Sequence, residues 1–167
     1  MKTRFKITRA LLASIRRDLD RPHPFAYERV GFISAGLATA GDNLLILARN
    51  YRPLMDHEYL PNISVGAMMG PDAIRSALQW ALETGGAMFH VHTHGGFGVP
   101  SFSTIDICEN AKFVLDFFKV ASYAAHGAIV LSNDAVSGQV WCNRNEPYEF
   151  IQDFVEVGVP IRKWRGT

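Results

Sequence analysis

The chain is organised around one stretch of sequence, Phe89-His90-Val91-His92-Thr93-His94-Gly95-Gly96-Phe97-Gly98-Val99-Pro100-Ser101-Phe102-Ser103-Thr104-Ile105-Asp106. Its first part places histidine at alternate positions within an apolar run, which predicts a buried strand. A glycine-rich loop follows, and Ser-x-x-Asp then predicts the beginning of a helix. Because side chains at positions i and i+2 of a strand point to the same face, His92 and His94 can converge on one ion.

Asp106 is the natural third ligand for such an ion. It falls in the first turn of the predicted helix, where the helix dipole favours a carboxylate, and Ser103 occupies the N-cap position. A catalytic zinc ion commonly takes three protein ligands and leaves one position for water. We therefore expect a zinc hydrolase with His92, His94 and Asp106 as ligands. His90 shares the strand face but lies deeper in the apolar run, so we expect it to pack behind the ligands.

Predicted strands and helices alternate along the rest of the chain. Helices are expected over 9–20, capped by Thr8, over 71–83, between Gly70-Pro71 and Gly85-Gly86, and over 104–119. Strands are expected over 3–7, 27–34, 43–48, 64–68, 87–92, 128–131 and 138–142, while 150–155 fits a helix or a strand and 49–63 an irregular connection. This pattern predicts the α/β class with a mixed sheet, and the length of 167 residues predicts a single domain over 1–167.

Composition narrows the class of partner. Apolar residues make up 48% of the chain, charged residues 20%, and the formal net charge is +1, which gives no reason to expect nucleic-acid or membrane-surface binding. No apolar run approaches the length of a membrane span, and Arg16, Arg17 and Asp18 interrupt the apolar stretch near the N-terminus, unlike a signal peptide. Cys108 and Cys142 are isolated, so we expect free thiols and a cytoplasmic protein.

Other histidine motifs fit less well. His57-Glu58-Tyr59-Leu60-Pro61 begins like the zincin motif HExxH, but proline replaces the second histidine, so that motif is rejected. Asp56, His57 and Glu58 are more often polar loop residues than residues that touch substrate, and both alternatives stay open. The alternating histidines also resemble the histidine triad of nucleotide hydrolases, yet the threonine and glycines around them are not the apolar residues which that motif requires. The H-x-E and P-C-x-x-C motifs of zinc deaminases are absent. His23 and His126 are expected to be structural or solvated.

In order and spacing, these residues resemble the JAMM or MPN-type zinc peptidases, in their prokaryotic JAB branch. The family motif is an upstream glutamate, then His-x-His, a loop and Ser-x-x-Asp. This chain has Glu28-Arg29-Val30-Gly31, His92-Thr93-His94 and Ser103-Thr104-Ile105-Asp106, a resemblance that covers about residues 25–132. Gly95 stands where the family often has proline, and the loop to the serine is one residue longer than in many members.

The resemblance implies a fold and a mechanism. The fold would be a three-layer domain with a curved mixed sheet flanked by helices, like the JAMM/MPN and cytidine-deaminase folds. One catalytic Zn²⁺ with a bound water would be held by His92, His94 and Asp106. Glu28 would act as the general base and Ser103 would stabilise the oxyanion.

The resemblance also implies a substrate. JAMM-type enzymes of this kind cleave a peptide or isopeptide bond after the C-terminal tail of a ubiquitin-like protein, in deconjugation or precursor processing. A compact JAB domain resembles the enzymes of bacterial ubiquitin-like operons, including antiphage ones. Two alternatives stay open: a JAB peptidase that processes sulfur-carrier proteins, and a non-catalytic MPN-type interaction scaffold. The scaffold is disfavoured because such domains usually lack the histidines.

Overall fold

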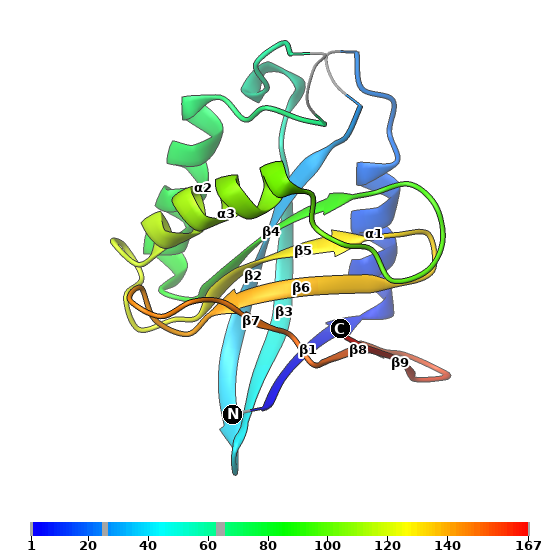
Figure 1. Ribbon diagram of the computed structural model, residues 1–167, viewed down its shortest axis with the longest axis vertical. Coiled ribbons are helices and arrows are strands. Elements are labelled where there is room, and N and C mark those ends of the chain that lie inside the picture. The colour runs from blue at the N-terminus through cyan, green and yellow to red at the C-terminus, as the bar shows by residue number, and fades with distance from the viewer. Residues whose placement is uncertain (1, 25–26, 63–65, 167) are drawn as a thin grey trace.

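The computed structural model describes residues 2–24, 27–62 and 66–166 (Figure 1). These residues form a mixed α/β structure built on one sheet of nine strands, in the order β7-β6-β5-β4-β2-β3-β1-β8-β9. The strands are β1 (Lys2–Thr8), β2 (Val30–Ala40), β3 (Asn43–Pro53), β4 (Ala87–Thr93), β5 (His126–Leu131), β6 (Val136–Trp141), β7 (Glu149–Phe150), β8 (Asp153–Val157) and β9 (Arg162–Arg165). The helices are α1 (Arg9–Leu19), α2 (Pro71–Thr84), α3 (Thr104–Phe117) and the 3₁₀ helix η1 (Asp56–Glu58).

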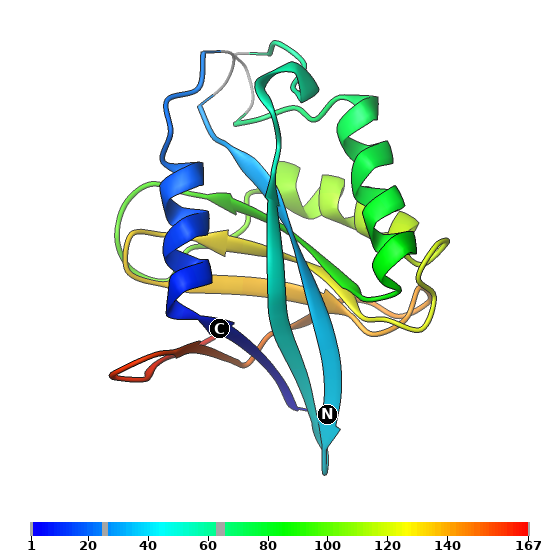
Figure 2. The same ribbon diagram turned by 180° about the vertical axis from the view of Figure 1, so that it is seen from behind.

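The sheet is mixed and strongly twisted. β1 runs parallel to β3 and β8, β4 runs parallel to β5, and the remaining neighbours are antiparallel. The long β2–β3 hairpin crosses the middle of the molecule and links the half that contains β4, β5 and β6 to the half that contains β1 and β8 (Figures 1 and 2). The predicted α/β class with a mixed sheet is therefore confirmed.

Helices cover both faces of the sheet. Leu12, Ile15 and Leu19 of α1 pack in one apolar cluster with Phe89 and Val91 of β4. On the other face, three alanines of α2 and Phe117 of α3 pack with Met88. Figure 1 shows α3 in front of the sheet, and Figure 2 shows α1 on the opposite side. Since β4 alternates between the two faces, its histidines lie on the face that α2 and α3 cover.

Local sequence signals explain the helix ends. Thr8 Oγ1 accepts a hydrogen bond from the backbone N–H of Leu11 at 3.3 Å and so caps α1, as predicted. α2 begins with Pro71 and ends at Gly85, whose φ of 57° is the left-handed conformation that glycine adopts without steric cost. The predicted helices over 9–20 and 71–83 are confirmed to within one residue.

Two expectations about the middle of the chain are wrong. Residues 49–63 are not all irregular, because β3 continues to Pro53 and η1 follows. The C-terminal half of β3 is polar, so its residue pattern does not indicate a strand. It pairs with the beginning of β2 up to Gly31↔Pro53. The predicted strand over 64–68 lies partly outside the described residues, and 66–68 form no strand; Met69 makes a single bridge with Tyr59.

The C-terminal region resolves the ambiguity over 150–155 in favour of strands. β8 adds in parallel to β1, with Phe5 opposite Phe154, and β9 completes that edge. The side chains of Phe5, Phe89 and Phe154 contact one another in the core, with ring centroids 5.3 and 5.8 Å apart for the Phe5 pairs.

Within the described residues, every helix is too short or too polar to cross a membrane.

Candidate metal centre

His92 and His94 bring their imidazoles together at the end of β4. Their Nε2 atoms lie 3.2 Å apart, and the backbone N–H of His94 continues the ladder by donating to Leu131 O at 2.8 Å. This extra hydrogen bond keeps His94 in strand register one residue beyond Thr93, so both rings stay on the same face. The sequence prediction that the two side chains converge is consistent with this geometry.

Asp106 reaches the same point from the first turn of α3. Its Oδ1 lies 3.6 Å from His92 Nε2 and its Oδ2 lies 3.4 Å from His94 Nε2. Ser103 caps the helix as predicted: its Oγ accepts from the Asp106 N–H at 3.1 Å, and its own N–H donates to Asp106 Oδ2 at 2.7 Å. The helix cap therefore fixes the carboxylate in the orientation that faces the histidines.

The electrostatics keep Asp106 ionised. Burial of the carboxyl favours its neutral form, but the His92 imidazole and the hydroxyl and N–H of Ser103 outweigh burial, so the pKa of Asp106 lies well below its usual range. An ionised carboxylate beside two imidazole nitrogens is a donor set that suits zinc.

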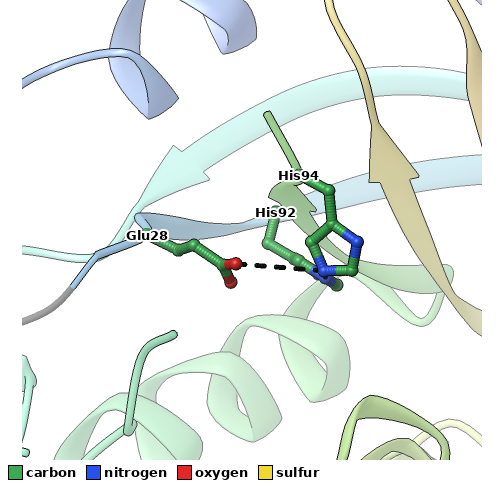
Figure 3. Close-up of side chains that lie close together, drawn as sticks. All are labelled: Glu28, His92 and His94. Atoms are coloured by element: carbon green, nitrogen blue, oxygen red, sulfur yellow. Dashed lines mark hydrogen bonds and ion pairs between the residues drawn. The ribbon is translucent and has the colours of Figure 1, made fainter. Parts of the chain in front are cut away.

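Glu28 lies just before β2 and points its carboxylate toward the two imidazoles (Figure 3). Its Oε1 is 3.9 Å from His94 Nε2. Burial raises the pKa of Glu28 above its usual value, assisted by the nearby Asp106, while the two imidazoles act in the opposite direction. One atom from each of Glu28, His92 and His94 lies within 4.8 Å of the others, so this triad could hold a metal ion.

Two carboxylates thus border the same pair of imidazoles, that of Asp106 at a slightly shorter distance than that of Glu28. Ligands at 2.0–2.1 Å from a tetrahedral zinc ion are about 3.3–3.4 Å from one another. The two Nε2 atoms are 3.2 Å apart, and the Asp106 carboxylate lies at a similar distance from each ring, with Oδ2 3.4 Å from His94 Nε2 and Oδ1 3.6 Å from His92 Nε2. Glu28 Oε1 is slightly further away, 3.9 Å from His94 Nε2, and Glu28 also offers an oxygen within 4.8 Å of a nitrogen of each ring. The residues present therefore fit a zinc ion.

The fit departs from the common pattern at one atom. The Nδ1 atom of His92 is buried and has no hydrogen-bond partner among the described residues. Metal-binding histidines usually donate from the second ring nitrogen to a carboxylate or carbonyl, which fixes the ring. The His92 ring is instead held by packing, since it is 2% exposed and its centroid lies 6.1 Å from that of Phe102.

Two residues that the sequence analysis did not identify position Glu28. Arg29 is 3% exposed and pairs with Asp56 Oδ1 at 2.8 Å, while also donating to the carbonyls of Arg21 and Pro22. Asp56 therefore has a structural role as the ion-pair partner of Arg29, and it does not line the cleft described below. Gly66 packs its main chain against the Glu28 carboxylate, where a side chain would collide. No local pattern in the sequence signals either role, because both depend on tertiary contacts.

The loop between His94 and Ser103 is tied to the turn after β5. The N–H of Gly98 donates to Asp134 Oδ1 at 2.7 Å, and Ser132 Oγ donates to Gly98 O at 2.7 Å. The N–H of Asn133 donates to Gly96 O at 3.0 Å. Gly96 and Gly98 have φ values of 96° and 87°, which only glycine adopts without strain, so the glycines allow the sharp return to α3.

A cleft of about 620 Å³ opens beside the candidate ligands. The segment 66–69 forms one wall and α3 forms the other, with Ile105 and Phe113 among its apolar lining. His90 and Asn110 line the cleft as buried residues. The His90 ring packs between Phe113 and His92, with centroids 5.2 and 5.3 Å away, and burial lowers its pKa to about 3, so the ring is neutral. This matches the packing position predicted for His90.

His126 is a structural residue, as expected. It is completely buried, its Nδ1 accepts from the Met88 N–H at 3.1 Å, and its Nε2 lies 2.9 Å from Ala121 O. The His23 ring contacts Tyr59, with centroids 4.3 Å apart. Cys108 and Cys142 are free thiols.

Comparison with known proteins gives no assignment. No protein-family model matches this chain, and no curated protein is similar to it in sequence. Among solved structures, the N-terminal domain of STIL from Trichoplax adhaerens is similar with a TM-score of 0.39 and 14% identity, over 80% of this chain and 39% of that chain. This chain therefore spans less than half of the length of that domain's chain, and a likeness at this level indicates neither family nor function.

Proposed function

We propose that this protein is a zinc-dependent peptidase or isopeptidase of the JAMM type, which cleaves after the C-terminal tail of a ubiquitin-like protein. The observation that carries the proposal is the triangle of His92, His94 and Asp106, in which the two Nε2 atoms are 3.2 Å apart and the Asp106 oxygens Oδ2 and Oδ1 lie 3.4 Å from His94 and 3.6 Å from His92. Glu28 borders this triangle with a carboxylate whose pKa is raised by burial. A ligand triangle and an adjacent base are the parts that hydrolysis of an amide requires.

Zinc, when bound, would lower the pKa of its water toward about 7 and so supply a nucleophile near neutral pH. Glu28 Oε1 would accept a proton from that water as it attacks the carbonyl, and would pass the proton to the leaving amine. Its raised pKa suits both transfers, because a base closer to neutral pH accepts and releases a proton more readily. Ser103 Oγ already accepts from the Asp106 N–H, which leaves its O–H proton to donate to the oxyanion.

The surroundings of the site support a protein substrate with an extended tail. The cleft runs between the segment 66–69 and α3 and leads to the candidate ligands, so an extended chain that lies in it would bring one of its peptide bonds to the site. Apolar side chains are exposed on the adjoining loop and the first turn of α3: Phe97 is 82% exposed, Val99 50% and Ile105 56%. Exposed apolar groups beside a cleft are typical of a surface that meets another protein.

The experiment is a cleavage assay with zinc-loaded protein. The substrates are a panel of ubiquitin-like proteins, including sulfur carriers, each fused through its C-terminal tail to a reporter protein. The wild type is expected to release the reporter directly after the tail, and a chelator should abolish the reaction. Glu28→Gln should retain zinc and lose cleavage, whereas His92→Ala should lose both.

Gln139→Leu serves as the matched control, because Gln139 is buried on β6 and contributes no side chain to the cleft. This variant should cleave as the wild type does. The proposal is overturned if zinc-loaded wild type leaves the whole panel intact, or if Glu28→Gln cleaves at the wild-type rate.

A further inference from the structure

Two buried polar side chains that line the cleft each have one nitrogen atom without a hydrogen-bond partner among the described residues. Asn110 is 1% exposed and His90 is 7% exposed, and both line the cleft. Asn110 Nδ2 and His90 Nδ1 find no hydrogen-bond partner among the described residues. Folded proteins keep few such atoms, because an unpaired buried donor or acceptor destabilises the fold. Where natural sequences retain them, the cause is often a functional site.

Each of the two side chains follows or precedes a candidate metal ligand by one period of its element, two residues on the strand and four on the helix. His90 precedes His92 by two residues on β4, so both point to the same face of the sheet. Asn110 follows Asp106 by four residues on α3, so both lie on the same side of the helix. Each step corresponds to about 6–7 Å along its element. His90 and Asn110 are therefore each displaced by one such step from a candidate ligand, and both line the same cleft.

The hydrogen-bonding groups of His90 and Asn110, together with their apolar surroundings, indicate the class of ligand that they could bind. The Asn110 amide can donate from Nδ2, and His90 Nδ1 can accept in the tautomer with the proton on Nε2. Phe113 and Phe32 surround the His90 ring, with centroids 5.2 and 5.8 Å away, and an apolar wall penalises a charged ligand. A neutral group that offers one carbonyl and one N–H matches these atoms. An amide, as in a peptide unit or a carboxamide side chain, is that group.

We propose that His90 and Asn110 form a subsite that binds an amide group of the substrate about two residues from the scissile bond. The spacing follows because about 6–7 Å corresponds to two residues of an extended chain. The assignment of this group to a substrate rests on the peptidase function proposed above. The capacity of His90 and Asn110 to bind an amide is independent of the peptidase function, and it can be tested without any cleavage.

The first test uses Asn110→Leu, which keeps a similar volume and removes the unpaired amide. The melting temperature should stay equal or rise, because an unpaired polar group is lost from the interior. Zinc content should be unchanged. KM for the fusion substrate should rise about fivefold to tenfold, the equivalent of one neutral hydrogen bond, with kcat less affected. Asn110→Ala provides a second variant in case leucine does not fit.

Gln139→Leu is the matched control. Gln139 is 1% exposed, and its Oε1 and Nε2 also lack partners among the described residues. It lies in the same cross-strand row as His90, with Ala128 between them, but it does not line the cleft. Gln139→Leu should change the melting temperature in the same direction as Asn110→Leu does, and should leave KM unchanged. Equal KM values for wild type and Asn110→Leu would overturn the subsite.

The second test measures binding alone by NMR, with N-methylacetamide as the probe. Both the wild type and the control Gln139→Leu should show saturable shifts of two signals, the Asn110 side-chain amide and the His90 ring. Methyl acetate, which has the carbonyl but no N–H, should bind more weakly, and Asn110→Leu should show no saturable His90 shift. Absence of saturable shifts in the wild type, or equal binding by Asn110→Leu, contradicts the subsite. Amide binding without cleavage of any fusion contradicts only the peptidase function.

Discussion

The main chain of Gly66 lies directly against the carboxylate of Glu28. A Cβ atom at position 66 would overlap Oε2 of that side chain. The carbonyl of Gly66 also accepts hydrogen bonds from the N–H groups of Tyr27 and Glu28, at 3.0 and 2.9 Å. The residue proposed as the general base is therefore held by a segment that is distant in sequence, and a side chain at position 66 would fit only if the Glu28 carboxylate moved.

Gly66→Ala should displace the Glu28 carboxylate without touching the metal ligands. Because a misplacement of about 1 Å can cost about 100-fold in rate, we expect kcat to fall about 10-fold to 100-fold while zinc content is unchanged. Steady-state kinetics and metal analysis measure the two quantities. Gly95→Ala is the control, since a Cβ there meets no atom within 4 Å. A Gly66→Ala enzyme with wild-type kcat would show that this contact does not position the base.

The two carboxylates beside the histidines should differ in their effect on metal affinity. Asp106→Asn removes a proposed ligand and should weaken zinc binding by more than about 100-fold, because the loss of an outer hydrogen-bond partner alone costs about 10–100-fold. Glu28→Gln should bind zinc with nearly wild-type affinity. Competition titration against a chromogenic chelator gives both constants. If Glu28→Gln lost more affinity than Asp106→Asn, Glu28 would be the ligand and the assigned roles would be reversed.

The stability of the metal-free protein should depend on pH through His126. Burial lowers the pKa of His126 to about 4, whereas an unfolded histidine titrates near about 6.5. Between these values the unfolded state binds the extra proton, so stability is full above about pH 6.5 and is lost as the pH falls toward 4. One such group contributes a slope of up to about 1.4 kcal/mol per pH unit. Urea unfolding of wild type and His126→Gln between these pH values should give a shallower slope for the variant, and identical slopes would refute this role.

The contact between Asp134 and the glycine loop should control the order of that loop. Asp134→Ala removes the acceptor for the Gly98 N–H, a hydrogen bond to a charged group that contributes about 1.5–3 kcal/mol. We expect faster amide hydrogen exchange at Gly98 and weaker zinc binding, because the loop joins His94 to Ser103. Hydrogen exchange followed by NMR measures the first effect. Unchanged protection of Gly98 would mean that the backbone contact between Asn133 and Gly96 suffices.

Much of the fold and of the candidate site follows from local sequence. Pro71 and Gly85 delimit α2 because their backbone preferences match the two ends of a helix. His92 and His94 share a strand face, and the cap formed by Ser103 aims Asp106 back toward them. These relationships depend on residues that are close in sequence, so the pattern alone predicts them.

Features that depend on distant contacts could not be predicted in this way. The second half of β3 is polar and becomes a strand because it pairs with the beginning of β2. β8 is placed beside β1 from the opposite end of the chain. Gly66 and Asn110 carry no local signal, since the importance of each comes from a side chain that the fold brings against it or leaves unpaired. The role proposed for Glu28 comes from the resemblance to the JAMM motif, because a single glutamate before a strand carries no signal of its own.

The most direct measurement of the central claim is zinc K-edge X-ray absorption on the zinc-loaded protein, together with metal analysis of the same sample. We expect one zinc ion per chain, with a first shell of nitrogen and oxygen at about 2.0–2.1 Å that includes the imidazole scattering of His92 and His94. The imidazole signal should be lost in the His92→Ala, His94→Ala double variant. Absence of bound zinc, or a first shell that contains sulfur from Cys108 or Cys142, would contradict the account.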